Sequence, residues 1–551
     1  MRVDSRLLAP LVLVVVGAVT WWATATEPVA VKASVPKATV VPITQTTLVC
    51  PQAGGAAPGG AARITYADAG ASADISTPAA GGTEPPSTLT TTPLNPAGQP
   101  SPIGIQSGHA WVIEGPPTVS PVQIVANGPV SRTLVASQYN RVTVAGALQL
   151  AVGSCEGPMT DAWFAGFSSQ AGEHTSLWLG NADSIPATVD VTIYADQSGA
   201  DPTTRRGIKV DPHTEVQVPL DSIEPDVKDA VVRVTSTIGR VVSAVRFDAS
   251  NGSIPLGFDW LPRTNAPALT QTVPGFVRGA GSRRLIVAVP GSVDATLSLK
   301  LVTADGSFTP TEFESLTVKA GTVSRIDLDP VLQAQAATVV VTSSEPVVVG
   351  GASALAPNKA GASDVGFTAA VPALSGPTVV SGGEVGGLRH TQLLLAAPDA
   401  DANVTVRVLP SNSASSPLVS PLSIPAGTLM VLDLGAIGSD PAPGVVVTPT
   451  GGGPVYAAWV LQEAGKGTTA FSSLPLRTPL RSLVQPAAQA NLVAGFPGAA
   501  ASSAVPSSPE PASPEPSLPA SPADSSAPPA DSSAPPALQS PVGPSSSQPS
   551  P

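Results

Sequence analysis

An internal repeat of about 107 residues constrains the fold of this chain more than any other feature of its sequence. Val189, Leu297 and Val404 occupy equivalent places in three apolar segments, at spacings of 108 and 107 residues. The three units also align at a later leucine and at a threonine in a valine-rich segment: Leu220, Leu328 and Leu434, then Thr235, Thr342 and Thr448. We therefore expect tandem copies of one structural unit, each large enough for its own hydrophobic core.

The residue pattern inside each unit predicts β-strands. In the segment from Val189 to Ile193, apolar side chains alternate with polar ones, which places the apolar set on one face of a strand. The chain contains 51 glycines and 62 prolines, which disfavour helices and favour short strands joined by turns. We predict an all-β fold of tandem immunoglobulin-like β-sandwich modules, because a propeller blade of about 40–50 residues is too short for this repeat.

The sequence divides into six parts. A divergent first β module spans residues 40–167, and its Gly/Ala/Pro/Thr-rich stretch from Ala53 to Gln106 is expected to form a long mobile loop. Three β-sandwich repeats follow, at 174–282, 283–387 and 388–498. A Pro/Ser/Ala-rich tail at 499–551 lacks apolar periodicity, so we expect it to be disordered, either as a spacer or as a tail without a role.

The N-terminal part, residues 1–26, is expected to be a signal peptide or a membrane anchor. Arg2 and Arg6 precede an apolar run from Leu7 to Val19, and an A-x-A cleavage site ends at Ala25. The stretch is also just long enough to span a membrane as a helix, and the Trp21-Trp22 pair suits a membrane interface. Both alternatives place the rest of the chain outside the cytoplasm, on the cell membrane or secreted.

The two cysteines agree with an exported protein. Cys50 and Cys155 give an even count, and neither belongs to a CxxC motif that would indicate metal or redox chemistry. We expect them to form a structural disulfide, which is typical of oxidising compartments. The net charge of −12, without a basic cluster longer than two residues, argues against a nucleic-acid partner.

The sequence offers no strong sign of catalysis, and we predict no catalytic, cofactor or metal site. It lacks a GxSxG elbow and a P-loop, and the glycine-rich stretch 382–387 has the wrong spacing for GxGxxG. The histidines are too few and too scattered for a zinc site: His109, His174, His213 and His390. We therefore predict that the chain is not an enzyme.

Two acidic patterns have structural explanations. Asp399, Asp401 and Asn403 match the opening of a calcium loop, but Val404 and Pro410 replace the required glycine and glutamate, so a repeated turn explains them better. The acids that a glycosidase could use recur at one place of the repeat, which favours a structural role: Asp221, Asp327, Asp329 and Asp433.

Several of these features together resemble the DUF5719 family of actinobacterial exported proteins of unknown function. They are the N-terminal apolar segment, the Leu48-Val49-Cys50-Pro51 strand, strands of the Val341-Thr342-Ser343 type and the Pro/Ser tail. The resemblance covers roughly Thr46 to Leu492. It implies a location in the cell envelope and supplies no catalytic residue.

The leading hypothesis for function is a non-catalytic scaffold or interaction protein of the cell envelope. Its expected partners are the membrane, through the N-terminal segment, and either cell-wall glycan or another envelope protein. The first alternative is a glycan-binding module or adhesin, which would need exposed aromatic side chains. The candidates are Trp163, Trp178, Trp260 and Trp459. The second alternative is a secreted hydrolase of unrecognised type.

Overall fold

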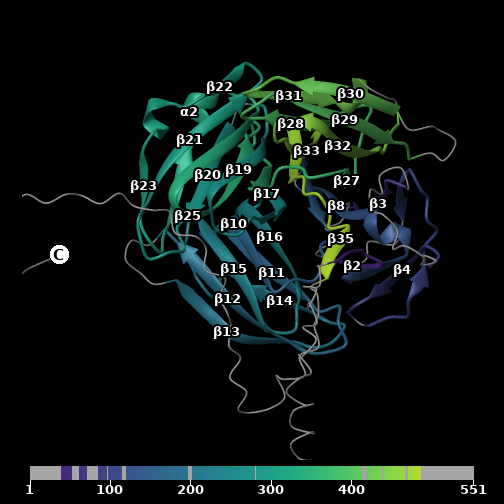
Figure 1. Cartoon of the computed structure of the whole chain (residues 1–551). Helices are drawn as coiled ribbons and strands as arrows, with labels where there is room; N and C mark the ends of the chain where they lie inside the picture. Colours follow the sequence, from purple (N-terminus) through teal and green to yellow (C-terminus); the bar gives the residue numbers. More distant parts are fainter. Residues whose placement is uncertain are drawn as a thin grey trace, which may run out of the picture. The chain divides into compact units, whose positions relative to one another are not determined.

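The structure is a computed structural model of the chain, and it describes eleven stretches of residues. They are 39–51, 61–70, 85–95, 97–113, 120–144, 146–196, 202–279, 281–411, 418–436, 440–465 and 469–485. These residues form antiparallel sheets within one unit that ends at Ala487, so the prediction of an all-β chain is confirmed (Figure 1). The short helical elements among them are η2 (Pro129–Arg132), η3 (Thr311–Phe313), α2 (Asp329–Leu332) and η4 (Leu434–Ala436).

Two predicted parts lie outside the described residues: the N-terminal segment at 1–26 and the tail at 499–551. Within the stretches that the structure describes, no helix has the length and apolar character needed to cross a membrane.

The strands form four modules, each with eight strand positions in chain order. The first module holds β2 (Gln45–Cys50), β3 (Ala61–Asp68), β4 (Thr88–Pro93), β5 (Ser101–Pro102), β6 (Ala110–Ile113), β7 (Val122–Asn127), β8 (Leu134–Val144) and β9 (Ala147–Ser154). The second holds β10 (Asp161–Phe167), β11 (Glu173–Gly180), β12 (Ala187–Ala195), β13 (Thr203–Val210), β14 (Glu215–Pro219), β15 (Ala230–Ile238), β16 (Val242–Asn251) and β17 (Ile254–Leu261).

The third and fourth modules follow the same plan. The third holds β19 (Ala268–Phe276), β20 (Gly281–Ala288), β21 (Ala295–Thr303), the short pair β22 (Gly306–Phe308) and β23 (Leu316–Val318), β24 (Val323–Asp327), β25 (Ala337–Leu355) and β26 (Val365–Ala369). The fourth holds β27 (Thr378–Val380), β28 (Arg389–Ala397), β29 (Ala402–Leu409), β30 (Leu418–Ile424), β31 (Thr428–Asp433), β32 (Gly444–Gly452), β33 (Tyr456–Ala464) and β34 (Thr469–Pro475).

Each module forms two sheets with the same strand order. One sheet contains the first, sixth, third and fourth strands, as in β2-β7-β4-β5 and β27-β32-β29-β30. The other contains the fifth, second, seventh and eighth strands, as in β6-β3-β8-β9 and β31-β28-β33-β34. In the second module β18 (Arg263–Thr264) extends the first sheet beside β10, and in the third module the long strand β25 belongs to both sheets. The divergent first module therefore shares the topology of the other three.

This strand order does not confirm the prediction of immunoglobulin-like modules. In an immunoglobulin domain the first two strands are neighbours in one sheet. Here the first and second strands lie in different sheets, as β10 and β11 show. The two sheets still enclose a shared core, since Leu285 from one sheet and Leu299 from the other belong to the same buried cluster.

The alternating segments form equivalent strands, as the repeat predicts. β12, β21 and β29 are the third strands of their modules, and each turns its apolar residues inward. The aligned residues Val189, Leu297 and Val404 are all buried. Period-two alternation therefore identified the buried face of these strands correctly.

The interpretation of 53–106 as one long loop is wrong for the described part of that range. β3, β4 and β5 lie within it: β3 pairs with β8, β4 pairs with β7, and β5 pairs with β4. In β3 the alternation of Arg63, Ile64, Thr65 and Tyr66 supplies a strand, and Tyr66 is buried against Trp111. The Gly- and Pro-rich flanks concealed this short pattern in the composition.

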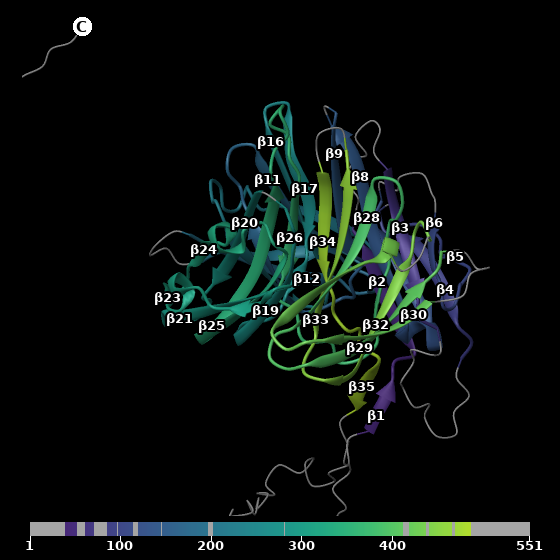
Figure 2. The ribbon, with the colours of Figure 1, turned by 90° about the horizontal axis from the view of Figure 1, so that it is seen from above.

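The last strands of the four modules form an inner ring, which we define as β9, β17, β26 and β34. Each contacts the next, and β34 returns to contact β9, so the first and fourth modules meet (Figure 2). Glycines permit this close approach. A Cβ at Gly257 would lie 2.4 Å from the backbone nitrogen of Val365, and one at Gly366 would lie 2.6 Å from the ring of Phe471.

Two buried carboxyl groups connect the strands of the inner ring. Asp259 in β17 accepts the backbone N–H of Phe367 at 3.2 Å and the Ser472 hydroxyl at 3.0 Å. The Oγ of Ser472 in turn accepts the N–H of Val152 in β9 at 3.0 Å. Strands from all four modules are therefore joined through Asp259 and Ser472.

Asp364 makes a second set of connections just before β26. Its Oδ2 accepts the N–H of Leu150 at 3.1 Å and that of Phe471 at 3.0 Å, which ties β9 and β34 to β26. Both carboxyl groups are fully buried. Burial raises the pKa of Asp259 and of Asp364 well above the ordinary value, although backbone N–H donors oppose the shift, and the nearby charge of Asp259 raises the pKa of Asp364 further.

Ion pairs connect neighbouring modules outside the inner ring. They join Arg284 to Asp229 at 3.0 Å, Lys300 to Asp399 at 2.6 Å and Arg141 to Glu463 through two bonds of 2.9 and 2.7 Å. The first pair links the second and third modules, the second links the third and fourth, and the last links the fourth back to the first. Arg284 and Asp229 are largely buried, so their pair is sheltered from screening by salt.

The two ends of the described chain also pair with each other. β1 (Thr39–Pro42) runs antiparallel to β35 (Ser482–Gln485), and the N–H of Ile43 donates to the carbonyl of Arg481 at 2.9 Å. This two-stranded ribbon joins the chain before the first module to the chain after the fourth.

The raised pKa values of the two aspartates predict an unusual pH dependence of stability. At a pH above 3.8, the ordinary pKa of an Asp side chain, the unfolded chain releases protons that the two folded carboxyl groups retain. The contribution of each group to the free energy of unfolding therefore falls as pH rises from about 4 through the folded pKa. We expect Asp259→Asn and Asp364→Asn to remove this fall, because a neutral amide keeps an oxygen acceptor. Denaturant titrations at pH 4 to 8 measure the difference from wild type.

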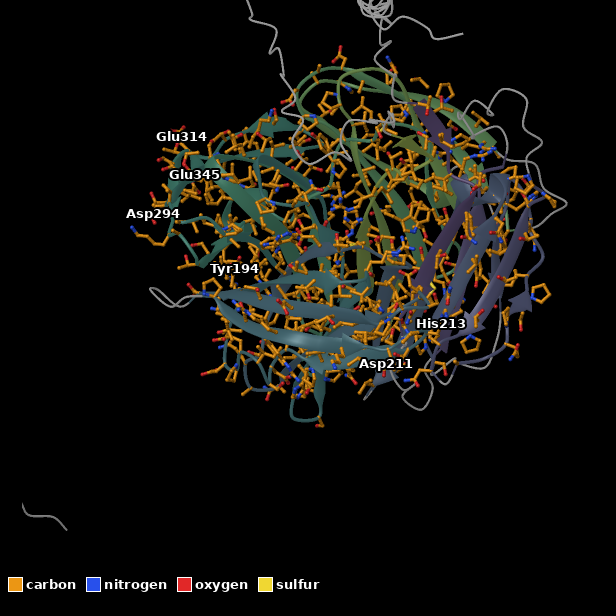
Figure 3. All side chains as sticks on the ribbon, turned by 60° about the horizontal axis from the view of Figure 1, so that its bottom comes forward. Tyr194, Asp211, His213, Asp294, Glu314 and Glu345 are labelled. Atoms are coloured by element: carbon orange, nitrogen blue, oxygen red, sulfur yellow. A yellow bond between two sulfur atoms is a disulfide. The ribbon has the colours of Figure 1, made fainter. Side chains whose placement is uncertain are left out.

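Asp294→Asn is the matched control, since Asp294 lies in an exposed turn at the surface of the third module (Figure 3). Hydrogen bonds from Lys319 and from the backbone of Ala320 lower the pKa of its carboxyl, so its effect has the opposite sign. If Asp259→Asn and Asp364→Asn leave the pH profile as steep as the control does, the two buried carboxyl groups do not control it.

Candidate functional site

A cavity of about 650 Å³ lies where three strands of the inner ring end. The chain segments that follow β9, β17 and β34 line it, together with β2, β8 and β27. Gln45, Asp161 and Leu480 on its lining are exposed, so the cavity opens to solvent. We call it the axial cavity. Its volume lies within the range of about 300–1,000 Å³ that is typical of small-molecule sites.

Three arginines and two acids line the axial cavity. Arg240 pairs with Asp183 through two hydrogen bonds of 2.8 and 3.1 Å, and Asp161 pairs with Arg233 at 2.9 and 3.0 Å. These two pairs are internally balanced, and their partners Asp183 and Arg233 do not line the cavity.

The other lining charges are Arg263, Arg477 and Glu156. Arg263 reaches Glu156 at 3.5 Å, the long end of the range for a hydrogen bond. Arg477 donates hydrogen bonds to neutral acceptors: the Asn265 side chain at 2.8 Å, the Arg263 carbonyl at 2.8 Å and the Ala370 carbonyl at 2.6 Å. Burial and then the charge of Arg263 lower the pKa of Arg477 to about 9, which leaves its guanidinium charged at neutral pH.

Polar atoms without a partner accompany these charges. The Nε of Arg263, the Oγ of Ser243 and the Oε1 of Gln138 are buried and make no hydrogen bond within the described residues. Buried polar groups are normally satisfied by protein, water or a ligand. These three unsatisfied atoms belong to side chains that line the axial cavity.

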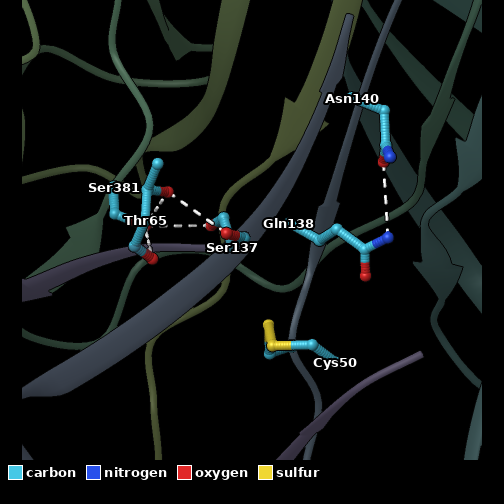
Figure 4. The surroundings of a disulfide bond; sticks show 7 residues. Cys50, Thr65, Ser137, Gln138, Asn140 and Ser381 are labelled. Atoms are coloured by element: carbon cyan, nitrogen blue, oxygen red, sulfur yellow. Dashed lines mark hydrogen bonds between the residues drawn. A yellow bond between two sulfur atoms is a disulfide. The ribbon is translucent and has the colours of Figure 1, made fainter. Parts of the chain in front are cut away.

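The predicted disulfide forms and lies beside the axial cavity. Cys50 at the end of β2 bonds to Cys155, which lines the cavity just after β9. Figure 4 shows two polar contacts nearby: the hydroxyls of Thr65, Ser137 and Ser381, which link the first and fourth modules, and the side chains of Gln138 and Asn140. The indole Nε1 of Trp260 donates to Asn140 at 3.2 Å and joins the second module to the same wall.

The structure does not gather the histidines into a site. The Nδ1 of His109 lies 2.9 Å from the Ser107 carbonyl, that of His174 lies 3.1 Å from Asp221, and that of His390 lies 3.8 Å from Asp433. His213 occupies a turn beside Asp211, with a positive φ of 54° (Figure 3). Within the described ranges, no group of three or more His, Cys, Asp or Glu side chains is placed to hold a metal ion.

The acids considered for catalysis are spread over three modules. Asp221 lies beside His174, and Asp433 accepts the N–H of Gly435 at 2.8 Å. Asp327 pairs with Arg325 at 2.8 Å, and Asp329 pairs with Arg283 at 2.6 Å. None of the four lines the axial cavity.

The calcium-like segment forms a turn that recurs in the repeat. Asp401 accepts the N–H of Ala426 at 2.7 Å, as Asp294 accepts that of Ala320 at 2.9 Å in the preceding module. Asp399 pairs with Lys300, and Asn403 accepts the Ser423 hydroxyl at 2.7 Å. At least one side-chain oxygen of each of these three residues thus has a protein partner.

The four tryptophans proposed as a glycan platform are buried: Trp163, Trp178, Trp260 and Trp459. Their exposed fractions are 3%, 8%, 4% and 0%. Trp163 stacks on Tyr194, and Trp459 belongs to the core of the fourth module. These side chains do not form an exposed aromatic surface.

Sequence reasoning missed the residues that matter most at this site. Arg263 and Arg477 occur in the segments that link or close modules, each followed by a threonine, and this repeated Arg-Thr pair was the available signal. Glu156 and Ser243 carry no comparable signal, because only the closure of the inner ring brings them near the arginines.

These features define a class of protein: a closed set of four β-sandwich modules around a buried polar centre, with a solvent-open cavity at one end. The model of a family of unknown function, DUF5719, matches residues 114–434, which is more than half of the chain. The chain belongs to this family. No curated protein matches the sequence.

The disulfide predicts a testable loss of stability. Cys50→Ser combined with Cys155→Ser removes a cross-link between residues 105 positions apart, which should lower the free energy of unfolding by roughly 2–5 kcal/mol. Guanidinium unfolding of the full chain measures the change, and reduction of the wild type should reproduce it. Identical midpoints with and without reductant would contradict the prediction.

Proposed function

We propose that this chain is a non-catalytic binding protein of the cell envelope, displayed outside the cytoplasmic membrane, with the axial cavity as its ligand site. The observation that carries the proposal is the convergence of three modules on one solvent-open cavity whose lining includes charged and polar side chains. Such sites, concave and with few convergent polar groups, are the usual places for ligands.

Two observations support a location outside the cytoplasm. The Cys50–Cys155 disulfide persists most readily in an oxidising compartment. The apolar run from Leu7 to Val19 follows two arginines, as in a secretory signal or an N-terminal anchor. N-terminal sequencing of the mature protein separates these alternatives, because a chain that begins at Thr26 has lost the segment.

The lining of the axial cavity supports binding rather than catalysis. Each lining acid forms an ion pair, Glu156 with Arg263 and Asp161 with Arg233. Cys155 is held in the disulfide. The residues that line the cavity supply no histidine to activate its serines.

Cell-wall glycan is the partner that the lining favours. Hydroxyl and amide groups recognise sugar hydroxyls, and the cavity presents Ser137, Ser154, Ser243, Gln138 and Thr478. The proposed contact is thus a polar cavity and does not depend on the buried tryptophans. Another envelope protein is the remaining partner, and it would need to insert a polar side chain or terminus.

A cavity-filling variant tests this function. Ala244 is half-buried and lines the cavity, so Ala244→Trp should occupy the space and abolish retention of the full chain on isolated cell-wall glycan. Ala426→Trp, in an exposed turn outside the cavity lining, is the matched control and should be retained like wild type. Equal retention of wild type and Ala244→Trp would exclude the axial cavity as the glycan site, and no retention of wild type would exclude the glycan.

A further inference from the structure

The axial cavity carries an excess of positive charge. The pairs Arg240–Asp183 and Arg233–Asp161 are neutral, so the balance depends on Arg263, Arg477 and Glu156. Two guanidinium groups share this single carboxylate, which leaves one uncompensated positive charge at the cavity. A buried charge without a counter-charge is costly, and a bound anion removes that cost.

The hydrogen bonds of Arg263 and Arg477 hold this positive charge in a fixed position. Arg263 makes only a long bond of 3.5 Å to Glu156, and its side chain is 27% exposed, so part of it is accessible to a ligand. Arg477 is fixed by three hydrogen bonds, one of them to the backbone carbonyl of Arg263 itself. The two side chains are therefore held together, and Arg477 is already ordered before a ligand arrives, which reduces the entropy cost of binding.

We propose that the axial cavity binds the anionic group of a small organic molecule, a carboxylate or a phosphate, at Arg263 and Arg477. This inference rests on the proposed function of the cavity as the ligand site and specifies the ligand class. The volume of the cavity suits a molecule about the size of a sugar acid or sugar phosphate.

Calorimetric titration of the full chain with three matched probes tests the proposal. The probes are glucose, glucuronate and glucose 6-phosphate, at equal ionic strength and pH 7. We expect at least one of the two anions to bind at least about tenfold more tightly than glucose, because its charge-assisted bonds to guanidinium are stronger than neutral ones. The preferred anion distinguishes a carboxylate ligand from a phosphate ligand.

Three variants locate the binding. Arg263→Gln should weaken binding of the preferred anion about tenfold, whereas Glu156→Gln should tighten it, because the competing carboxylate is gone. Arg205→Gln is the matched control, since Arg205 is exposed on β13 outside the cavity lining, and it should leave affinity nearly unchanged. Arg477 anchors three backbone or side-chain acceptors, so the test does not depend on replacing it.

Several results would overturn the inference. They are equal affinity for glucose and the anions, no binding of either anion at about 10 mM, weaker binding in Glu156→Gln, or equal losses in Arg205→Gln and Arg263→Gln. The anion inference and the proposed function can fail separately. If Ala244→Trp abolishes glycan retention while Arg263→Gln leaves it intact, the cavity is the ligand site but the ligand is not an anion.

Discussion

The carboxyl groups of Asp259 and Asp364 are the interaction on which the arrangement of this chain depends. Each module can bury its own apolar core, but apolar packing alone does not fix how four modules meet. The two carboxyl groups accept donors from β9, β26 and β34 while belonging to β17 and the start of β26 themselves. The inner ring therefore has a polar centre that requires all four modules at once.

This polar centre fixes how the four modules meet, but burying its two carboxyl groups costs free energy. The pKa of both carboxyl groups is raised, because burial disfavours the charged form more than the backbone N–H donors favour it. Oδ1 of Asp364 has no partner within the described residues. Removing any one module would leave several more buried polar atoms unsatisfied, so we infer that the modules fold and unfold together.

The position of the axial cavity follows from the inner ring. The chain leaves β9, β17 and β34 at the same end of the ring, and Glu156, Arg263 and Arg477 occur within a few residues of those strand ends. The disulfide at Cys155 constrains one of these segments, and the hydrogen bonds of Arg477 constrain another. Charges from three modules are thus held close together by strands that pack at the centre.

The strands that recur in the repeat could be predicted from the sequence, whereas residues whose role depends on contacts between modules could not. The repeat and its alternation identified strands such as β12 and β29, and an even cysteine count identified the disulfide. Asp259 was missed because Thr368 and Ser472 occupy its place in the other repeats, so that alignment gives no signal there. Its role arises only when strands about 107 residues apart in the sequence meet. The cavity arginines do recur, each before a threonine, but the sequence gives no sign that the closed ring brings them together.

Hydrogen exchange of the native full chain tests the central claim most directly. Backbone amides in the inner ring, at 147–154, 254–261, 365–369 and 469–475, should be among the most protected in the chain and should open with one common free energy. This result is expected if the buried carboxyl groups join the four modules into one cooperative unit. Fast exchange of the inner strand of one module, while the other three remain protected, would show that the modules open independently and would contradict the account.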